Sequence, residues 1–219
     1  MELNIRAQLE KDGFIKINKP NLRDDELIDI SNVIGLPVES RIGGYIIDRL
    51  SPKKKESAYK NSLSNIYELN SFPLHSDTAY YKIPVKYIML YCKNPGTGGR
   101  PTYLYDTYQL INTDEELRFK LTNTIYKVIN GRNSFLTTLY NLDTSFFRFD
   151  RDCMRSTTSE GEELLKEIDS LIQKNDIQEF KWSLGDLLII DNWRFLHGRG
   201  SSKSEDFERL LYRISIRER

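Results

Sequence analysis

The sequence predicts a mainly β protein with flanking helices, built around a double-stranded β-helix, or jelly-roll, core. Many short apolar segments bounded by turn residues run through the 219 residues, and only a few segments have helical periodicity. The chain has no internal repeat and no regular alternation of strand and helix, which argues against a parallel α/β sheet. One domain over residues 1–219 is expected, because sandwiches and barrels of this length often form a single unit.

The first fifty residues are expected to be scaffold. Residues 1–12 predict a short amphipathic helix that ends at Gly13, and residues 14–17 predict the first strand. A second helix is expected over Asp24–Ile34, because acidic residues lie in its first turn and Gly35 follows its last. Residues 44–48 predict another strand.

Residues 51–70 are polar and show no sustained period. A loop of this length is usually either functional or disordered. Because it leads directly into segment 72–80, we expect a lid over a site there, with the lysine run 53–55 on a solvated surface.

The middle of the chain is expected to hold several strands and two helices. The strands are predicted at 85–92, 101–106, 124–129, 135–140 and 145–149, with a turn at 94–99. The helices are predicted at 113–123 and 159–174, each opened by a capping box that begins at Thr113 or at Ser159. The second helix has an apolar side that is expected to pack against a sheet.

The last third predicts three more strands, at 178–182, 187–191 and 209–216. A turn at 184–186 separates the first two. A loop that contains His197 follows the second.

Composition limits the classes of function. Lys plus Arg and Asp plus Glu both number 32, so the chain lacks the overall basic charge typical of nucleic-acid binding. No stretch approaches the roughly 18 apolar residues of a membrane span, and the N-terminal residues lack the apolar region of a signal peptide, so a cytoplasmic protein is expected. Cys92 and Cys153 lie far apart without metal-site spacing, which predicts two free thiols. The oligomeric state stays open.

The segment around His75 and Asp77 carries the strongest chemical signal. In an extended chain, residues two apart point to the same side, so both side chains could hold one ion. The only other histidine, His197, follows the apolar run 187–190. Two histidines and one carboxylate form a facial triad, which suits Fe(II) chemistry with oxygen and a co-substrate. Either part alone would more often be a chance match or a structural residue.

These residues resemble the taurine-dioxygenase-like branch of the Fe(II)/2-oxoglutarate-dependent oxygenases, a group that includes clavaminate synthase and amino-acid hydroxylases. The resemblance runs through most of the chain. It implies that His75, Asp77 and His197 bind iron, that Thr102 contributes to the 2-oxoglutarate site, and that Arg209 binds the far carboxylate of 2-oxoglutarate. The turn from Gly98 to Thr102 departs from the family pattern, because one extra residue separates the glycine pair from the threonine.

The residues around Arg209 support this role independently. The strand period places Arg209, Arg213 and Ser215 on one face. If that face lines the barrel, the buried guanidinium groups need an anion, and a dicarboxylate would satisfy them. Arg213 is therefore a second candidate for co-substrate binding. The alternative is a solvent-facing edge strand, since edges often carry charge.

The resemblance implies an enzyme that uses Fe(II), 2-oxoglutarate and O2 and releases succinate and CO2. Asp77 favours hydroxylation or desaturation over halogenation, because halogenating relatives replace this carboxylate. A second possibility is a non-catalytic jelly-roll protein that binds a metal and a ligand, since fold and ligands do not prove turnover. A nucleic-acid demethylase is disfavoured by the charge balance.

The expected substrate is a small, polar, carboxylate-bearing molecule such as an amino acid or a derivative, free or carrier-linked. Arginines in loops that a barrel mouth could gather motivate this expectation, namely Arg100, Arg148, Arg151 and Arg199, together with aromatic residues such as Tyr80. Arg199 is the preferred candidate, because it lies two residues after His197 and a guanidinium can hold a carboxylate with two hydrogen bonds.

Overall fold

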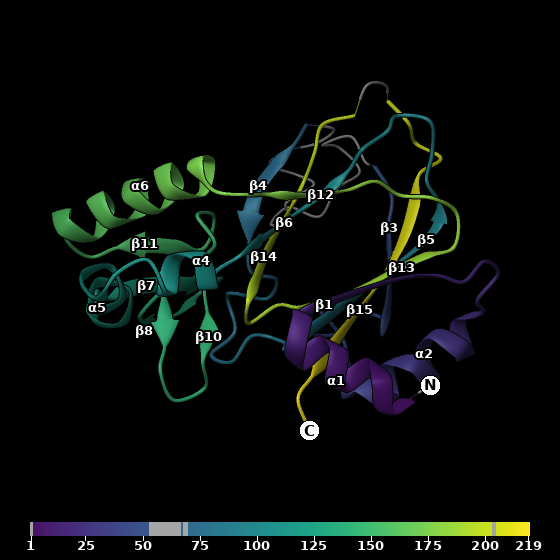
Figure 1. The fold of residues 1–219 in the computed structure, drawn as a ribbon, viewed down its shortest axis with the longest axis horizontal. Coiled ribbons are helices and arrows are strands. Elements are labelled where there is room, and N and C mark those ends of the chain that lie inside the picture. The colour runs from purple at the N-terminus through teal and green to yellow at the C-terminus, as the bar shows by residue number, and fades with distance from the viewer. Residues whose placement is uncertain (1, 53–66, 68–69, 203–204) are drawn as a thin grey trace.

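Two antiparallel sheets form the centre of the protein, which confirms the predicted mainly β, jelly-roll architecture (Figure 1). The structure is a computed structural model that describes residues 2–52, 67, 70–202 and 205–219. The lid expected at 51–70 lies almost entirely outside the described residues. No helix in the described part combines the length and apolar character that crossing a membrane requires.

The larger sheet has the strand order β1-β13-β5-β15-β2, and β3 also pairs with β15. Its strands are β1 (Phe14–Asn18), β2 (Leu36–Val38), β3 (Ile47–Leu50), β5 (Tyr87–Asn94), β13 (Asp186–Asp191) and β15 (Leu210–Arg217). The smaller sheet has the order β12-β6-β14-β4. Its strands are β4 (Phe72–His75), β6 (Thr102–Asp106), β12 (Gln178–Phe180) and β14 (Phe195–Arg199).

The central strands are apolar on both sides because each sheet face has a neighbour. On β13, Leu188 and Ile190 belong to a buried cluster shared with residues of the smaller sheet, including Leu104. Leu187 and Ile189 point the other way, into a cluster with residues of α1 (Glu2–Asp12) and α2 (Asp24–Ile34). A continuous apolar run is the expected sequence of a strand covered on both faces.

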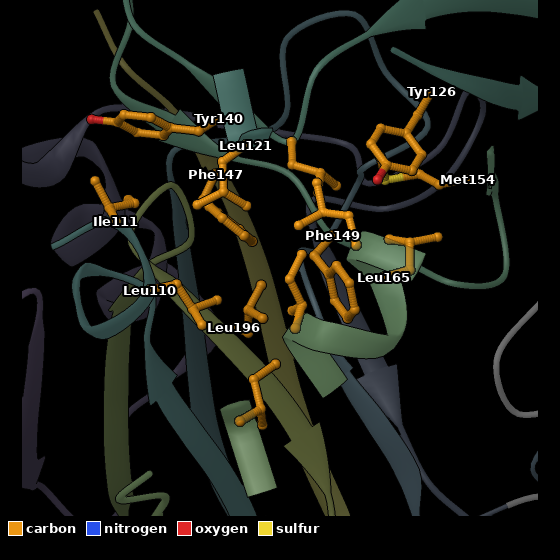
Figure 2. Packing of buried hydrophobic residues seen from close by; sticks show 14 of the residues in the cluster. Leu110, Ile111, Leu121, Tyr126, Tyr140, Phe147, Phe149, Met154, Leu165 and Leu196 are labelled. Atoms are coloured by element: carbon orange, nitrogen blue, oxygen red, sulfur yellow. The ribbon is translucent and has the colours of Figure 1, made fainter. Parts of the chain in front are cut away.

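A third layer lies beside the two sheets, on the left in Figure 1. It contains α4 (Tyr108–Ile111), α5 (Glu115–Asn123), α6 (Ser159–Lys174) and the strands β7 (Tyr126–Asn130), β8 (Asn133–Thr137), β9 (Tyr140–Asn141), β10 (Phe146–Phe147) and β11 (Met154–Ser156). As predicted, the apolar side of α6 packs against a sheet, here the one formed by β11, β7 and β8. Figure 2 shows Tyr126, Phe149, Met154 and Leu165 gathered in this cluster. The cluster therefore fixes the segment around Phe149, which borders the candidate site.

Both predicted capping boxes are one residue out of place. The N-cap of α5 is Asp114, whose carboxylate accepts a hydrogen bond from Leu117 N at 2.7 Å. Thr113 belongs to the turn that ends α4, where its backbone N donates to Leu110 O at 3.2 Å and its hydroxyl donates to Gln109 O at 2.6 Å. The N-cap of α6 is Thr158, whose hydroxyl oxygen accepts from Gly161 N at 3.1 Å. In both cases the residue with extended backbone and a side-chain oxygen supplies the cap.

Three further predictions were wrong in detail. The strand expected at 44–48 begins only at Ile47, where pairing with Ile214 of β15 starts, because residues 41–44 form a turn. His197 lies in strand β14 and not in a loop. Arg209 precedes β15, and a β-bulge between Leu210 and Leu211 interrupts the alternation expected for 209–215.

Candidate active site

His75 and His197 lie directly opposite each other on the antiparallel strands β4 and β14. Their ring centroids are 4.6 Å apart, and both residues are buried. Neighbouring side chains on paired strands lie close together on one face of a sheet. The strand pairing therefore unites the two histidines of the chain.

Asp77 follows the end of β4, and hydrogen bonds to its backbone N and O hold it in place. Asp77 N donates to Asn192 Oδ1 at 2.7 Å, and Asn192 Nδ2 donates to Asp77 O at 3.0 Å and to Val85 O at 2.8 Å. The next residue, Thr78, has a positive φ of 56°, and its hydroxyl accepts from Val85 N at 2.9 Å. Asn192 thus ties the turn after β4 to the chain entering β5.

The electrostatics keep Asp77 ionised and His197 neutral. Burial acts to raise the pKa of Asp77, but Arg213, followed by His197 and His75, outweighs it, so the pKa lies below the usual value. Burial, and then the charge of His75, lower the pKa of His197 to about 3. His75 Nδ1 lies 3.1 Å from Pro73 O, which suits a proton on Nδ1 and a lone pair on Nε2.

This donor set fits a divalent transition metal by its chemistry: two imidazole groups and one carboxylate. His197 Nδ1 is buried without a hydrogen-bond partner among the described residues. Within the same residues, however, no three His, Cys, Asp or Glu side chains are already gathered closely enough to hold an ion. The three donors would therefore have to close further around one.

A group of arginines lies near the end of β14. Arg199 is the last residue of this strand, and Arg100 and Arg209 lie near it. Burial, and then the charge of Arg100, lower the pKa of Arg209 to about 10. Burial, followed by Arg100 and Arg209, lowers the pKa of Arg199 to about 9, and burial also lowers that of Arg100. The charge of Arg100 acts on Arg209 and on Arg199, and that of Arg209 acts on Arg199, as expected for neighbouring cations. Asp206 offsets part of their charge at Arg100 and Arg209.

Thr102 belongs to the same region. It is buried and pairs with Arg199 across β6 and β14, and its hydroxyl accepts from Trp182 Nε1 at 3.0 Å. Arg209 is buried, and its Nε has no hydrogen-bond partner among the described residues. Arg100, Arg199 and Arg209, with Thr102, therefore form a cationic cluster next to the strand that carries His197, and such a cluster suits a carboxylate.

Arg213 lies apart from the cationic cluster of Arg100, Arg199 and Arg209. Its Nη1 donates to Asp77 Oδ2 at 2.8 Å and its Nη2 to Asp48 Oδ2 at 2.9 Å. Burial acts to lower the pKa of Arg213, but these two carboxylates outweigh it and raise the pKa above its usual value. This geometry favours a role next to Asp77 over the predicted role in co-substrate binding.

The residues predicted to bind substrate have different surroundings. Arg199 Nη2 donates to Asn70 O at 2.7 Å, and its guanidinium lies 4.4 Å from the centroid of the Phe72 ring. The hydroxyl of Tyr80 donates to Ser40 O at 3.0 Å, near the Asp48 end of the Arg213 contacts. Burial, followed by the charge of Asp77, raises the pKa of Tyr80 above its usual value, which places Tyr80 near the candidate metal ligand.

Arg148 and Arg151, which were grouped with these loop cations, do not line an anion site. Arg148 is fully buried and donates to the backbone carbonyls of Ala79, Tyr81 and Lys82. Arg151 lies 3.4 Å from Glu162 Oε1. Arg148 therefore stabilises the turn after Asp77 through hydrogen bonds to its backbone carbonyls.

Three residues of the site were missed from the sequence: Asn192, Asp48 and Ser40. Asn192 follows the predicted strand 187–191 and could have been noticed as a polar residue next to the His197 segment. The others gave no local signal, because their partners come from distant parts of the chain.

Comparison with protein families matches residues 3–130 and 122–215 to the family described as taurine catabolism dioxygenase TauD, TfdA family. A search of curated protein sequences finds no match.

Three solved structures illustrate the similarity of fold. An asparagine oxygenase in complex with Fe(II), 2S,3S-3-hydroxyasparagine and succinate has a TM-score of 0.79 and 14% identity, over 98% of this chain and 77% of that one. The non-heme iron oxygenase OrfP, with Fe and alpha-ketoglutaric acid, has a TM-score of 0.78 and 16% identity, over 100% and 79%. AAD-2, with Mn(II) and N-oxalylglycine, has a TM-score of 0.77 and 15% identity, over 100% and 89%. With the family match covering most of the sequence, the chain belongs to the TauD/TfdA family of dioxygenases.

Proposed function

We propose that the protein is an Fe(II)- and 2-oxoglutarate-dependent dioxygenase that hydroxylates a small polar substrate such as an amino acid or a derivative. The observation that carries this proposal is the cross-strand pair of His75 and His197. Asp77 lies beside the pair, and Arg199, two residues after His197 on β14, has the buried Arg209 as a neighbour. A metal site with a cationic cluster near it is what a metal-chelating dicarboxylate needs.

The roles of the residues follow from their surroundings. His75, Asp77 and His197 would hold the metal, which together with 2-oxoglutarate and O2 supplies the oxidising chemistry when bound. Arg209 and Thr102 would hold the far carboxylate of 2-oxoglutarate, and their burial would exclude water from that end. Charge-assisted bonds to a buried guanidinium are among the stronger hydrogen bonds in proteins.

The substrate class is supported by the cationic cluster and by the similar structures. Arg100 and Arg199 add positive charge next to Arg209, which suits a substrate with a carboxylate. Two of the similar structures contain hydroxylated amino acids, a hydroxyasparagine in the asparagine oxygenase and (3S)-hydroxy-L-Arg in an OrfP variant. We infer an amino acid or a derivative, with Arg199 and Arg100 near its carboxylate and Tyr80 near the metal ligands.

The test is formation of succinate from 2-oxoglutarate by purified protein with Fe(II), ascorbate and oxygen. We expect slow turnover without substrate and faster turnover with the matching amino acid. His75→Ala, Asp77→Ala and His197→Ala should each abolish it. Undiminished succinate formation in all three variants would refute the metal assignment, and stimulation by lipids or methylated oligonucleotides alone would refute the substrate class.

A visible absorption measurement on the same protein distinguishes an enzyme from a non-catalytic binding protein. Under anaerobic conditions, Fe(II) with 2-oxoglutarate should give a weak visible charge-transfer band if both bind one metal. Loss of this band when oxygen is admitted supports the dioxygenase. A band that persists in oxygen identifies the binding protein instead.

A further inference from the structure

Asp48 lies opposite Arg213 on the paired strands β3 and β15, which run side by side in Figure 1. The Arg213 guanidinium bridges two carboxylates, with Nη1 at 2.8 Å from Asp77 Oδ2 and Nη2 at 2.9 Å from Asp48 Oδ2. Asp48 and Asp77 are each only 8% exposed. One guanidinium therefore serves both a candidate metal ligand and an acid with no role in the proposed chemistry.

Asp48 is fixed independently of Asp77. The hydroxyl of Ser40 donates to Asp48 Oδ2, and Ser40 O accepts the hydroxyl hydrogen bond of Tyr80. The orientation of the Arg213 guanidinium is thus set from the β3 side of the contact, by a carboxylate that has its own anchor.

The charges suggest what this arrangement does. Two carboxylates and one guanidinium leave one net negative charge beside the histidine pair. Without Asp48, the positive charge of Arg213 would act on Asp77 alone, in a buried setting where the attraction between charges is strong. Arg213 would then compete with a metal ion for the Asp77 carboxylate.

We propose that Asp48 is a positioning residue for metal binding, which holds one side of the Arg213 guanidinium and offsets its positive charge, so that Arg213 competes less with the ion for the Asp77 carboxylate. The inference rests on the proposed metal site. It assigns Asp48 no contact with the metal, the co-substrate or the substrate, and predicts that its effect passes through Arg213. Residues that hold metal ligands in this way change metal affinity about 10- to 100-fold when they are replaced.

The test is calorimetric titration of the metal-free protein with Mn(II), without 2-oxoglutarate. Asp48→Asn is expected to weaken Mn(II) binding by about tenfold or more. Asp24→Asn is the matched control, because Asp24 is an exposed acid on α2 whose carboxylate lies 4.0 Å from the Arg49 guanidinium. The Mn(II) affinity of this variant should stay within twofold of wild type. Asp48→Glu, which keeps the charge, should bind more tightly than Asp48→Asn. If Asp48→Asn does not fold, Ser40→Ala carries the test, because it removes the hydroxyl that anchors Asp48 and should also weaken Mn(II) binding relative to wild type.

The double variant decides whether the effect passes through Arg213. In an Arg213→Gln background, Asp48→Asn should change Mn(II) affinity by less than threefold, because no guanidinium remains to be shared. Equal losses in both backgrounds, or an Asp48→Asn affinity within twofold of wild type, would overturn the inference. Absence of Mn(II) binding in the wild-type protein would instead overturn the proposed function.

Discussion

His75 and His197 face each other across β4 and β14 with their ring centroids 4.6 Å apart, although they belong to distant parts of the chain. Because one strand pairing brings them together, their separation depends on the register of the smaller sheet.

Metal binding should stabilise the folded protein by an amount that grows with the logarithm of the ratio of free metal to Kd. Free Mn(II) at 100 times its Kd is expected to add about 2.7 kcal/mol to the free energy of unfolding. For a chain of this size that corresponds to a rise in Tm of roughly 5 to 10 °C. Differential scanning fluorimetry should show this rise in wild type and none in His197→Ala. An equal rise in the variant would mean that Mn(II) binds elsewhere.

Removing Arg209 should weaken binding of 2-oxoglutarate while metal binding remains. Loss of a buried charged partner is expected to cost about 2 to 5 kcal/mol, by analogy with buried charge pairs at interfaces. The Kd for 2-oxoglutarate in Arg209→Ala should therefore rise by roughly 30-fold or more, at about 1.4 kcal/mol per decade. Arg217→Ala, which removes an exposed arginine at the far end of β15, is the control and should not change it. An unchanged Kd in Arg209→Ala would move the anchor to another arginine.

Asn192 should contribute to the stability of the folded protein. Its side chain makes three buried hydrogen bonds, with Asp77 N, Asp77 O and Val85 O. At about 1 kcal/mol for each bond, Asn192→Ala is expected to lower the free energy of unfolding of the metal-free protein by about 3 kcal/mol. Urea unfolding measures this change, and Asn123→Ala, at an exposed helix end, should cost much less. A loss no larger than that of the control would show that the turn after β4 is held by other contacts.

Cys92 gives a pH dependence with a defined sign. Burial raises the pKa of this thiol from about 9 to about 11 in the folded protein, with Arg209 acting weakly in the opposite direction. A group with a raised folded pKa contributes stability that is complete below the unfolded pKa and is lost as the pH rises through the folded pKa. Between pH 9 and pH 11 the thiol should therefore make wild type lose up to about 2 to 3 kcal/mol more than Cys92→Ala. Parallel pH profiles for the two proteins would exclude a buried neutral thiol.

The strands and helices that could be predicted from the sequence were those with a strong local pattern. The apolar run of β13, the acidic first turn of α2 and the apolar side of α6 all depend on neighbours along the chain, and the structure confirms each element. The capping residues were misplaced by one because Thr113 belongs to the turn after α4, and because Thr158 rather than Ser159 has the extended backbone of the N-cap of α6.

The candidate site was predictable in its residue types and not in its connections. Spacing alone brought His75 and Asp77 together, and the structure places His197 beside them. The sequence could not show that Arg213 turns to Asp77 and Asp48, because that choice depends on the pairing of β3 with β15 and on the bulge after Leu210. Whether these residues bind iron and 2-oxoglutarate stays a prediction.

The β4 and β14 pairing also has a consequence for the order of events during folding. Because the two histidines become neighbours only when these distant strands have paired, an unfolded chain offers an ion no preformed pair of imidazole ligands. Long-range strand pairing is a slow step in the folding of β proteins. Metal loading should therefore follow assembly of the smaller sheet. Mn(II) should lower the rate constant of unfolding and leave the rate constant of refolding unchanged.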